Sequence, residues 1–142
     1  MKRRKTKAEL AAGSMLAIHR SQAYSESHLV AFRLGVLEAL VRLKSGGAPE
    51  DWALIVECLN LAQVRASQIS LALVPPLMEA DAVMGKLKDQ YAADKTLKLA
   101  EVDYEPLAYA LEIFDQILVN SSPYQMQLAG EEVKRIINES RS

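Results

Sequence analysis

Cysteine, histidine and glycine are all scarce in this chain of 142 residues, and each scarcity removes a class of function. The one cysteine, Cys58, cannot form a disulfide within the chain, which is typical of a reducing compartment. The two histidines, His19 and His28, would point to roughly opposite sides of a continuous helix, and neither belongs to an ExxH or HExxH motif. The sequence therefore predicts no metal centre and no cofactor.

The glycines and the apolar runs exclude two further classes. None of the six glycines forms a phosphate-binding loop between a strand and a helix, so a Walker-type or dinucleotide site is not expected. No apolar run reaches the roughly 18 residues of a membrane-spanning helix. Residues 8–18 are too interrupted for the apolar core of a signal peptide. We expect a cytoplasmic protein with no membrane contact.

Positive charge is concentrated at the N-terminus. Of 17 basic side chains, five lie within the first seven residues, whereas the remaining 135 residues hold 12 basic against 18 acidic side chains. A basic tail therefore precedes a mildly acidic body that repels nucleic acid over most of its surface. The candidate polyanion-binding residues are Lys2, Arg3, Arg4, Lys5, Lys7 and Arg20.

The basic tail has four interpretations. It is a solvated terminus, a contact for the phosphate backbone of a nucleic acid, a docking element for an acidic protein surface, or a membrane attachment. The last is the least supported, because no lipidation signal is present. A helix-turn-helix over residues 6–26 is not supported, because its second helix offers only His19, Arg20 and Gln22 to the bases.

The apolar pattern is helical almost throughout, and half of the residues are hydrophobic. We predict an all-α protein, a compact bundle of five or six helices. A disordered, flexible basic tail over residues 1–6 precedes a single helical domain over residues 7–142. The predicted helices span residues 7 to about 20, 28–44, 50–74, 77–93, 103–120 and 122–138.

The first of these helices is indicated by a capping box at Thr6–Glu9 and by Leu10, Met15 and Ile18 on one side. It ends or kinks in the polar stretch 20–27, or it continues into the next helix. The sequence leaves both alternatives open.

Proline marks the bounds of the third helix. Pro49 opens it, and its nearly continuous apolar surface predicts a central position in the bundle. We expect Pro75 and Pro76 to end it, because neither has an amide hydrogen. Residues 94–103 are interpreted as a loop or an irregular turn, since a lone strand would have no partner.

Groups that could carry chemistry have simpler interpretations. Cys58 lies in the most apolar helix, and such surroundings favour a buried, unreactive thiol. Acidic residues gather before and on helix 103–120, but their spacing matches no calcium loop, and helix capping with a solvated face explains them. These residues are Glu101, Asp103, Glu105, Glu112 and Asp115.

The sequence predicts a small non-enzymatic protein that binds another macromolecule, as a homodimer or as a subunit of a larger assembly. No small-molecule substrate is evident. The candidate protein interface is an exposed apolar elbow that flanks the two prolines, although the same residues would also suit an ordinary core. The elbow consists of Leu71, Leu73, Leu77 and Met78.

Two alternatives belong to other classes. In the first, the protein is an accessory nucleic-acid-binding subunit, and residues 2–7 with Arg20, Arg33 and Arg42 follow a phosphate backbone. In the second, it is a small helical enzyme that uses Glu101, Asp103 or Glu112. Salt separates the first alternative from protein binding, because phosphate contacts weaken steeply with ionic strength.

Overall fold

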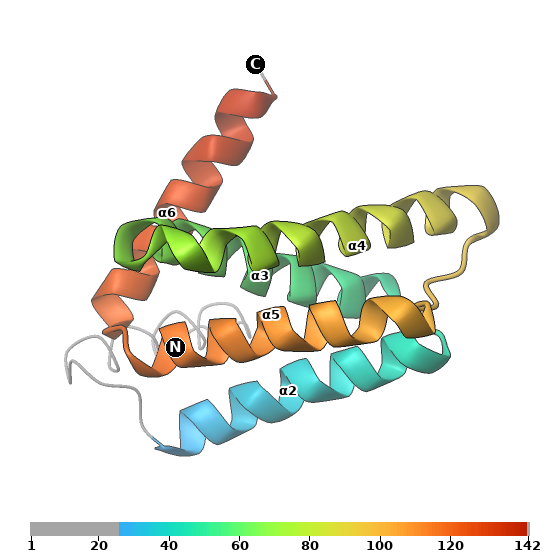
Figure 1. Ribbon diagram of the computed structural model, residues 1–142, viewed down its shortest axis with the longest axis horizontal. Coiled ribbons are helices and arrows are strands. Elements are labelled where there is room, and N and C mark those ends of the chain that lie inside the picture. Colours follow the sequence, from blue (N-terminus) through green and yellow to red (C-terminus); the bar gives the residue numbers. More distant parts are fainter. Residues whose placement is uncertain (1–25, 142) are drawn as a thin grey trace, which may run out of the picture.

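The computed structural model describes residues 26–141, which fold into an all-α bundle (Figure 1). This confirms the predicted fold class, and these residues contain no strand. The predicted tail and the predicted helix from residue 7 lie outside the described residues. The elements are α2 (Glu26–Ser45), α3 (Pro49–Ile69), the 3-10 helix η1 (Leu71–Leu73), α4 (Val74–Asp94), α5 (Glu101–Val119) and α6 (Pro123–Ser140).

Helix α3 is the central helix, as its apolar surface predicts. It packs against α2, α4, α5 and α6, and it supplies fully buried side chains such as Ile55, Leu59 and Ala62. Trp52 ties its first turns to α4 by donating its indole N–H to the carbonyl oxygen of Met84 at 2.9 Å.

The predicted boundary between α3 and α4 is wrong. Helix α3 ends at Ile69, and Ser70 has an extended backbone. Helix α4 begins at Val74, with Pro75 and Pro76 in its first turn. Because the amides of a first turn have no partner within the helix, the two prolines start a helix here instead of ending one.

The connection between α4 and α5 is irregular, as predicted, yet its two leucines are buried. Leu97 and Leu99 are each at most 5% exposed. The N–H of Leu99 donates to the carbonyl oxygen of Leu43 at 2.7 Å. The N–H of Gly47 donates to the carbonyl oxygen of Leu97 at 2.9 Å. The extended segment therefore pairs with the end of α2 and the following turn instead of with a strand.

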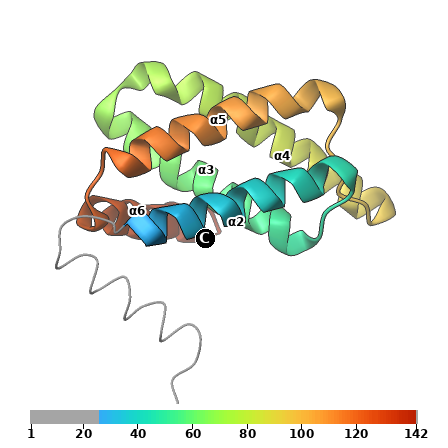
Figure 2. The ribbon, with the colours of Figure 1, turned by 90° about the horizontal axis from the view of Figure 1, so that it is seen from below.

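Helices α2 and α5 lie side by side and run antiparallel (Figure 2). Arg33, in the first half of α2, contacts Asp115 near the end of α5. At the other end of the pair, the Lys44 ammonium lies 4.4 Å from the centroid of the Tyr104 ring. This arrangement places α2 at an edge of the bundle, where one of its sides faces solvent.

Candidate functional site: two exposed apolar helical faces

The outer side of α2 carries a row of large aliphatic side chains, which we call the α2 stripe: Val30, Leu34, Leu37 and Val41. Their exposed fractions lie between 47% and 56%. A spacing of four, three and four residues places them on one side of the helix. The core is contacted by another side of α2, through Val36, Ala39, Leu40 and Leu43. Exposed apolar rows of this kind are typical of surfaces that contact another element or another molecule.

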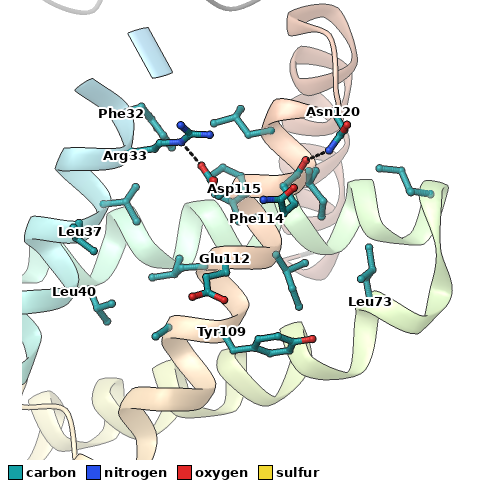
Figure 3. A pocket seen from close by; sticks show the side chains of 18 of the residues that line it. Phe32, Arg33, Leu37, Leu40, Leu73, Tyr109, Glu112, Phe114, Asp115 and Asn120 are labelled. Carbon is teal, nitrogen blue, oxygen red and sulfur yellow. Dashed lines mark hydrogen bonds and ion pairs between the residues drawn. The ribbon is translucent and has the colours of Figure 1, made fainter. Parts of the chain in front are cut away.

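An apolar groove of about 770 Å³ adjoins the α2 stripe and involves α2 and α5 (Figure 3). Leu37 belongs to both the stripe and the groove, and Phe32 and Leu40 add to the α2 wall. The Phe32 ring packs on the Phe114 ring of α5 with centroids 5.9 Å apart. The lining continues on α5 and reaches Leu73 on η1.

Acidic side chains border this groove on α5. The Asp115 carboxylate accepts a hydrogen bond from Arg33 Nε at 2.5 Å, and Glu112 also lines the groove. Glu101, Glu105 and Glu112 are exposed and share one side of α5 because they are four and seven residues apart. We call these three residues the acidic rim. Of these three, only Glu112 lines the groove, which therefore combines an apolar wall on α2 with the carboxylates of Glu112 and Asp115 on α5.

The second exposed apolar face lies on the distal half of α6. This helix is buried through Pro123, Met126 and Ala129, and it then extends beyond the other helices of the bundle (Figure 1). Val133 is half-buried, whereas Ile136 and Ile137 are 47% and 37% exposed. The sequence predicts all three to point inward, and this is wrong for the two isoleucines. We call Val133, Ile136 and Ile137 the distal α6 face.

Three charged residues, Glu132, Arg135 and Glu139, are joined by ion pairs on distal α6. Arg135 donates to Glu132 and, at 2.6 Å, to Glu139, three and four residues away. The Arg135 guanidinium lowers the pKa of the Glu132 carboxyl from its usual value, chiefly through the hydrogen bond. These ion pairs support the helix, and Ile136 borders the same hollow as Glu132 and Arg135.

The predicted apolar elbow is only partly exposed. Leu71 is 73% exposed and Met78 is 59% exposed, and Leu73 is half-buried in the wall of the groove. Leu77 is fully buried, so its prediction as an exposed residue is wrong. The reason is the start of α4 at Val74, which turns Leu77 toward the core and Met78 toward solvent.

The arginines predicted to follow a phosphate backbone are not brought together on a free surface. Arg33 contacts Asp115, and Arg42 Nε donates to Asp51 at 2.8 Å. The other candidate polyanion-binding residues, at positions 2–7 and 20, lie outside the described residues.

The residues that could carry chemistry are dispersed or engaged. Burial raises the pKa of the Cys58 thiol to about 12, and the negative charge of Glu57 adds to this shift. Asp103 accepts a hydrogen bond from Lys86 at 2.9 Å. Helix α5 begins at Glu101, with Ala100 at the cap position, two residues before the predicted start at residue 103.

Two kinds of feature are absent from residues 26–141. These residues contain no group of three or more histidine, cysteine, aspartate or glutamate residues that could hold a metal ion. None of their helices combines the length and the apolar character needed to cross a membrane.

Comparisons with protein-family models, with curated proteins and with solved structures found no match to this chain.

Sequence reasoning missed both faces as individual sites. The signal for the α2 stripe is present, because apolar residues occupy much more than one third of the circumference of helix 28–44. A helix that packs by one side needs only about that third. For α6, no signal in the sequence shows where α3 stops covering the helix.

Proposed function

We propose that this protein acts without catalysis, by binding a second protein molecule through the distal α6 face, and that this second molecule is another copy of the chain. A cytoplasmic location accompanies this proposal. The observation that carries it is the continuation of one apolar row from buried to exposed positions on a single helix.

The apolar row begins with Met126 and Ala129, which are buried against the rest of the bundle. Val133 and Ile137 follow at helical spacing on the same side, beyond the last buried residue of the helix. A side of α6 that already packs on α3 in its first half has the shape and polarity to pack on another helix in its second half.

A second copy is the partner that this short face suits best. A two-fold axis uses the same patch on both chains, so that a few apolar residues provide both halves of the contact. Antiparallel packing of two distal halves would bring the end of each α6 toward the α3 of the other chain. The row of apolar side chains would then continue across the boundary between the molecules.

The absence of catalysis is supported by the state of the groups that could react. Asp103 and Asp115 are engaged by Lys86 and Arg33. The Cys58 thiol is buried and resists ionisation, and a thiolate is the reactive form of cysteine. Nucleic-acid binding is the alternative, and the engagement of Arg33 and Arg42 by carboxylates counts against a phosphate track across the body.

The experiment is sedimentation analysis of the full chain at low and high salt, with and without a mixed-sequence DNA duplex. We expect a species of twice the 15.7 kDa chain mass that persists at high salt and does not bind the duplex. Ile137→Asp should weaken the dimer by at least about tenfold, since burying a charge costs well over ~1.4 kcal/mol.

Asn138→Asp is the matched control, because it adds the same charge to the neighbouring position on another side of α6. It should leave the dimer unchanged, and circular dichroism should show equal helix content in both variants. A parent protein that stays monomeric at every concentration would contradict the proposal. Joining the duplex at low salt alone would favour the nucleic-acid alternative.

A further inference from the structure

We propose that the α2/α5 groove binds a small hydrophobic amine, a molecule with an extended apolar body and one ammonium group. The apolar lining holds the body, and the Glu112 carboxylate pairs with the ammonium. This inference concerns a surface other than the distal α6 face and does not depend on the proposed dimer.

The size and the lining of the groove are those of a small-molecule site. Its volume of about 770 Å³ lies within the range of roughly 300–1,000 Å³ that is typical of ligand pockets. Four elements line it, namely α2, the end of α3, η1 and α5. The lining is largely apolar and includes the packed rings of Phe32 and Phe114, together with Leu37, Ile69 and Leu73. Walls of this kind bury the apolar body of a ligand, and a few polar groups then fix its orientation.

The charged side chains of the groove leave an excess of negative charge. Its lining holds one arginine, Arg33, and two carboxylates, Glu112 and Asp115. The Arg33 guanidinium pairs with Asp115. Within residues 26–141, no ion pair engages Glu112. The excess charge therefore belongs to Glu112, and charge complementarity favours a cation over an anion.

Glu112 lies where an ammonium can reach it from the apolar walls. In the view of Figure 3, its side chain projects from α5 between the α2 wall and Leu73. Tyr109, three residues earlier on α5, also lines the groove and is 54% exposed, so its ring can add a cation–π contact. A cation packs in this way on another tyrosine of α5, because the Lys44 ammonium lies 4.4 Å from the centroid of the Tyr104 ring.

The experiment compares three probes that share one apolar body. At about pH 7, octylamine is a cation, 1-octanol is neutral and octanoate is an anion. Titration of the full chain, followed by amide NMR, measures the affinity and the location of each probe. We expect octylamine to bind roughly twofold to fivefold more tightly than 1-octanol, as for exposed ion pairs, and octanoate to bind most weakly. The amide signals of Phe32 and Phe114 should shift, whereas that of Ala82, exposed on α4 outside the groove, should not.

Glu112→Gln tests the role of the carboxylate. It should remove the preference for octylamine over 1-octanol and leave the affinity for 1-octanol unchanged. Glu105→Gln is the matched control, because Glu105 is exposed on the same side of α5 but does not line the groove. It should preserve the preference. Equal affinities of the parent protein for all three probes, or the same loss of preference in both variants, would refute the assignment of a cation to Glu112.

A second pair of variants tests the apolar wall. Leu37 and Val41 are both about half exposed on α2, but only Leu37 lines the groove. Leu37→Ala should weaken the binding of all three probes by at least about threefold, because it removes apolar contact with their shared body. Val41→Ala should have no effect. Absence of binding by any probe would overturn the proposal. Equal losses in the two variants would overturn it as well, because they would place the probes on the α2 stripe.

Discussion

Arg42 Nε donates a hydrogen bond to Oδ1 of Asp51 at 2.8 Å and so joins the last turn of α2 to the first turn of α3. The other oxygen of Asp51 accepts the N–H of Ala48 at 2.9 Å, just before α3 begins. Asp51 is only 5% exposed. A buried carboxylate thus closes the α2–α3 turn, in which Gly46 takes a positive φ of 120° that favours glycine.

Replacement of this carboxylate should destabilise the fold. We expect Asp51→Ala to lower the free energy of unfolding by about 1–2 kcal/mol, because it removes the hydrogen bond that caps α3 and the ion pair with Arg42. Urea unfolding measures the effect. Glu50→Ala changes the neighbouring exposed carboxylate and should cost less than about 1 kcal/mol. Equal losses of unfolding free energy in the two variants would show that Asp51 stabilises the fold only through its charge near the start of α3, and not through its hydrogen bonds.

The Cys58 thiol should make stability depend on pH in the alkaline range. Burial raises its pKa from an ordinary 9.0 to about 12, so the folded state keeps the thiol neutral. Its contribution is complete below pH 9 and is lost as the pH rises toward 12. The stability advantage of the parent over Cys58→Ala should shrink by about 2 kcal/mol between roughly pH 8 and pH 10.5. A constant difference would mean that the folded thiol ionises like an unfolded one.

The helices were largely predictable because their signals are local. Ser122 and Gln125 form the capping box that their spacing predicts, and the Glu38–Arg42 pair closes at 3.8 Å. The burial of Leu97 and Leu99 was not predictable in the same way. Their backbone partners at Leu43 and Gly47 lie some fifty residues away and become neighbours only when α2 and α5 pack.

The candidate site was less predictable, since exposure depends on where neighbouring helices stop. Ile136 and Ile137 have the same helical spacing as buried residues such as Met126 and Ala129. Val64, Ser67 and Gln68 of α3 line a hollow together with Ile136, yet both isoleucines stay partly exposed. The sequence indicated an excess of apolar surface, and the structure assigns it to α2 and distal α6.

A buried arginine should control the turn between α5 and α6. Arg65 is 8% exposed, and its Nε donates to the Ser121 hydroxyl at 3.1 Å while Nη1 donates to Gln68 at 2.8 Å. We expect Ser121→Ala to lower the free energy of unfolding by about 1–3 kcal/mol, because it leaves a buried charged donor without its acceptor. Ser122→Ala removes the helix cap instead and should cost about 1 kcal/mol. Amide hydrogen exchange distinguishes the two variants, because loss of the Ser122 cap should speed exchange only in the first turn of α6.

The start of α4 allows a matched pair of substitutions at adjacent residues. Leu77 is fully buried and Met78 is 59% exposed. We expect Leu77→Ala to lower the free energy of unfolding by about 2–5 kcal/mol, because it opens a cavity in the core. Met78→Ala should change it by less than about 0.5 kcal/mol, as for other surface positions. Urea unfolding of both variants measures the contrast. Similar losses would place the helix start at the position that the sequence alone suggests, after Pro76, and would restore Leu77 to the exposed elbow.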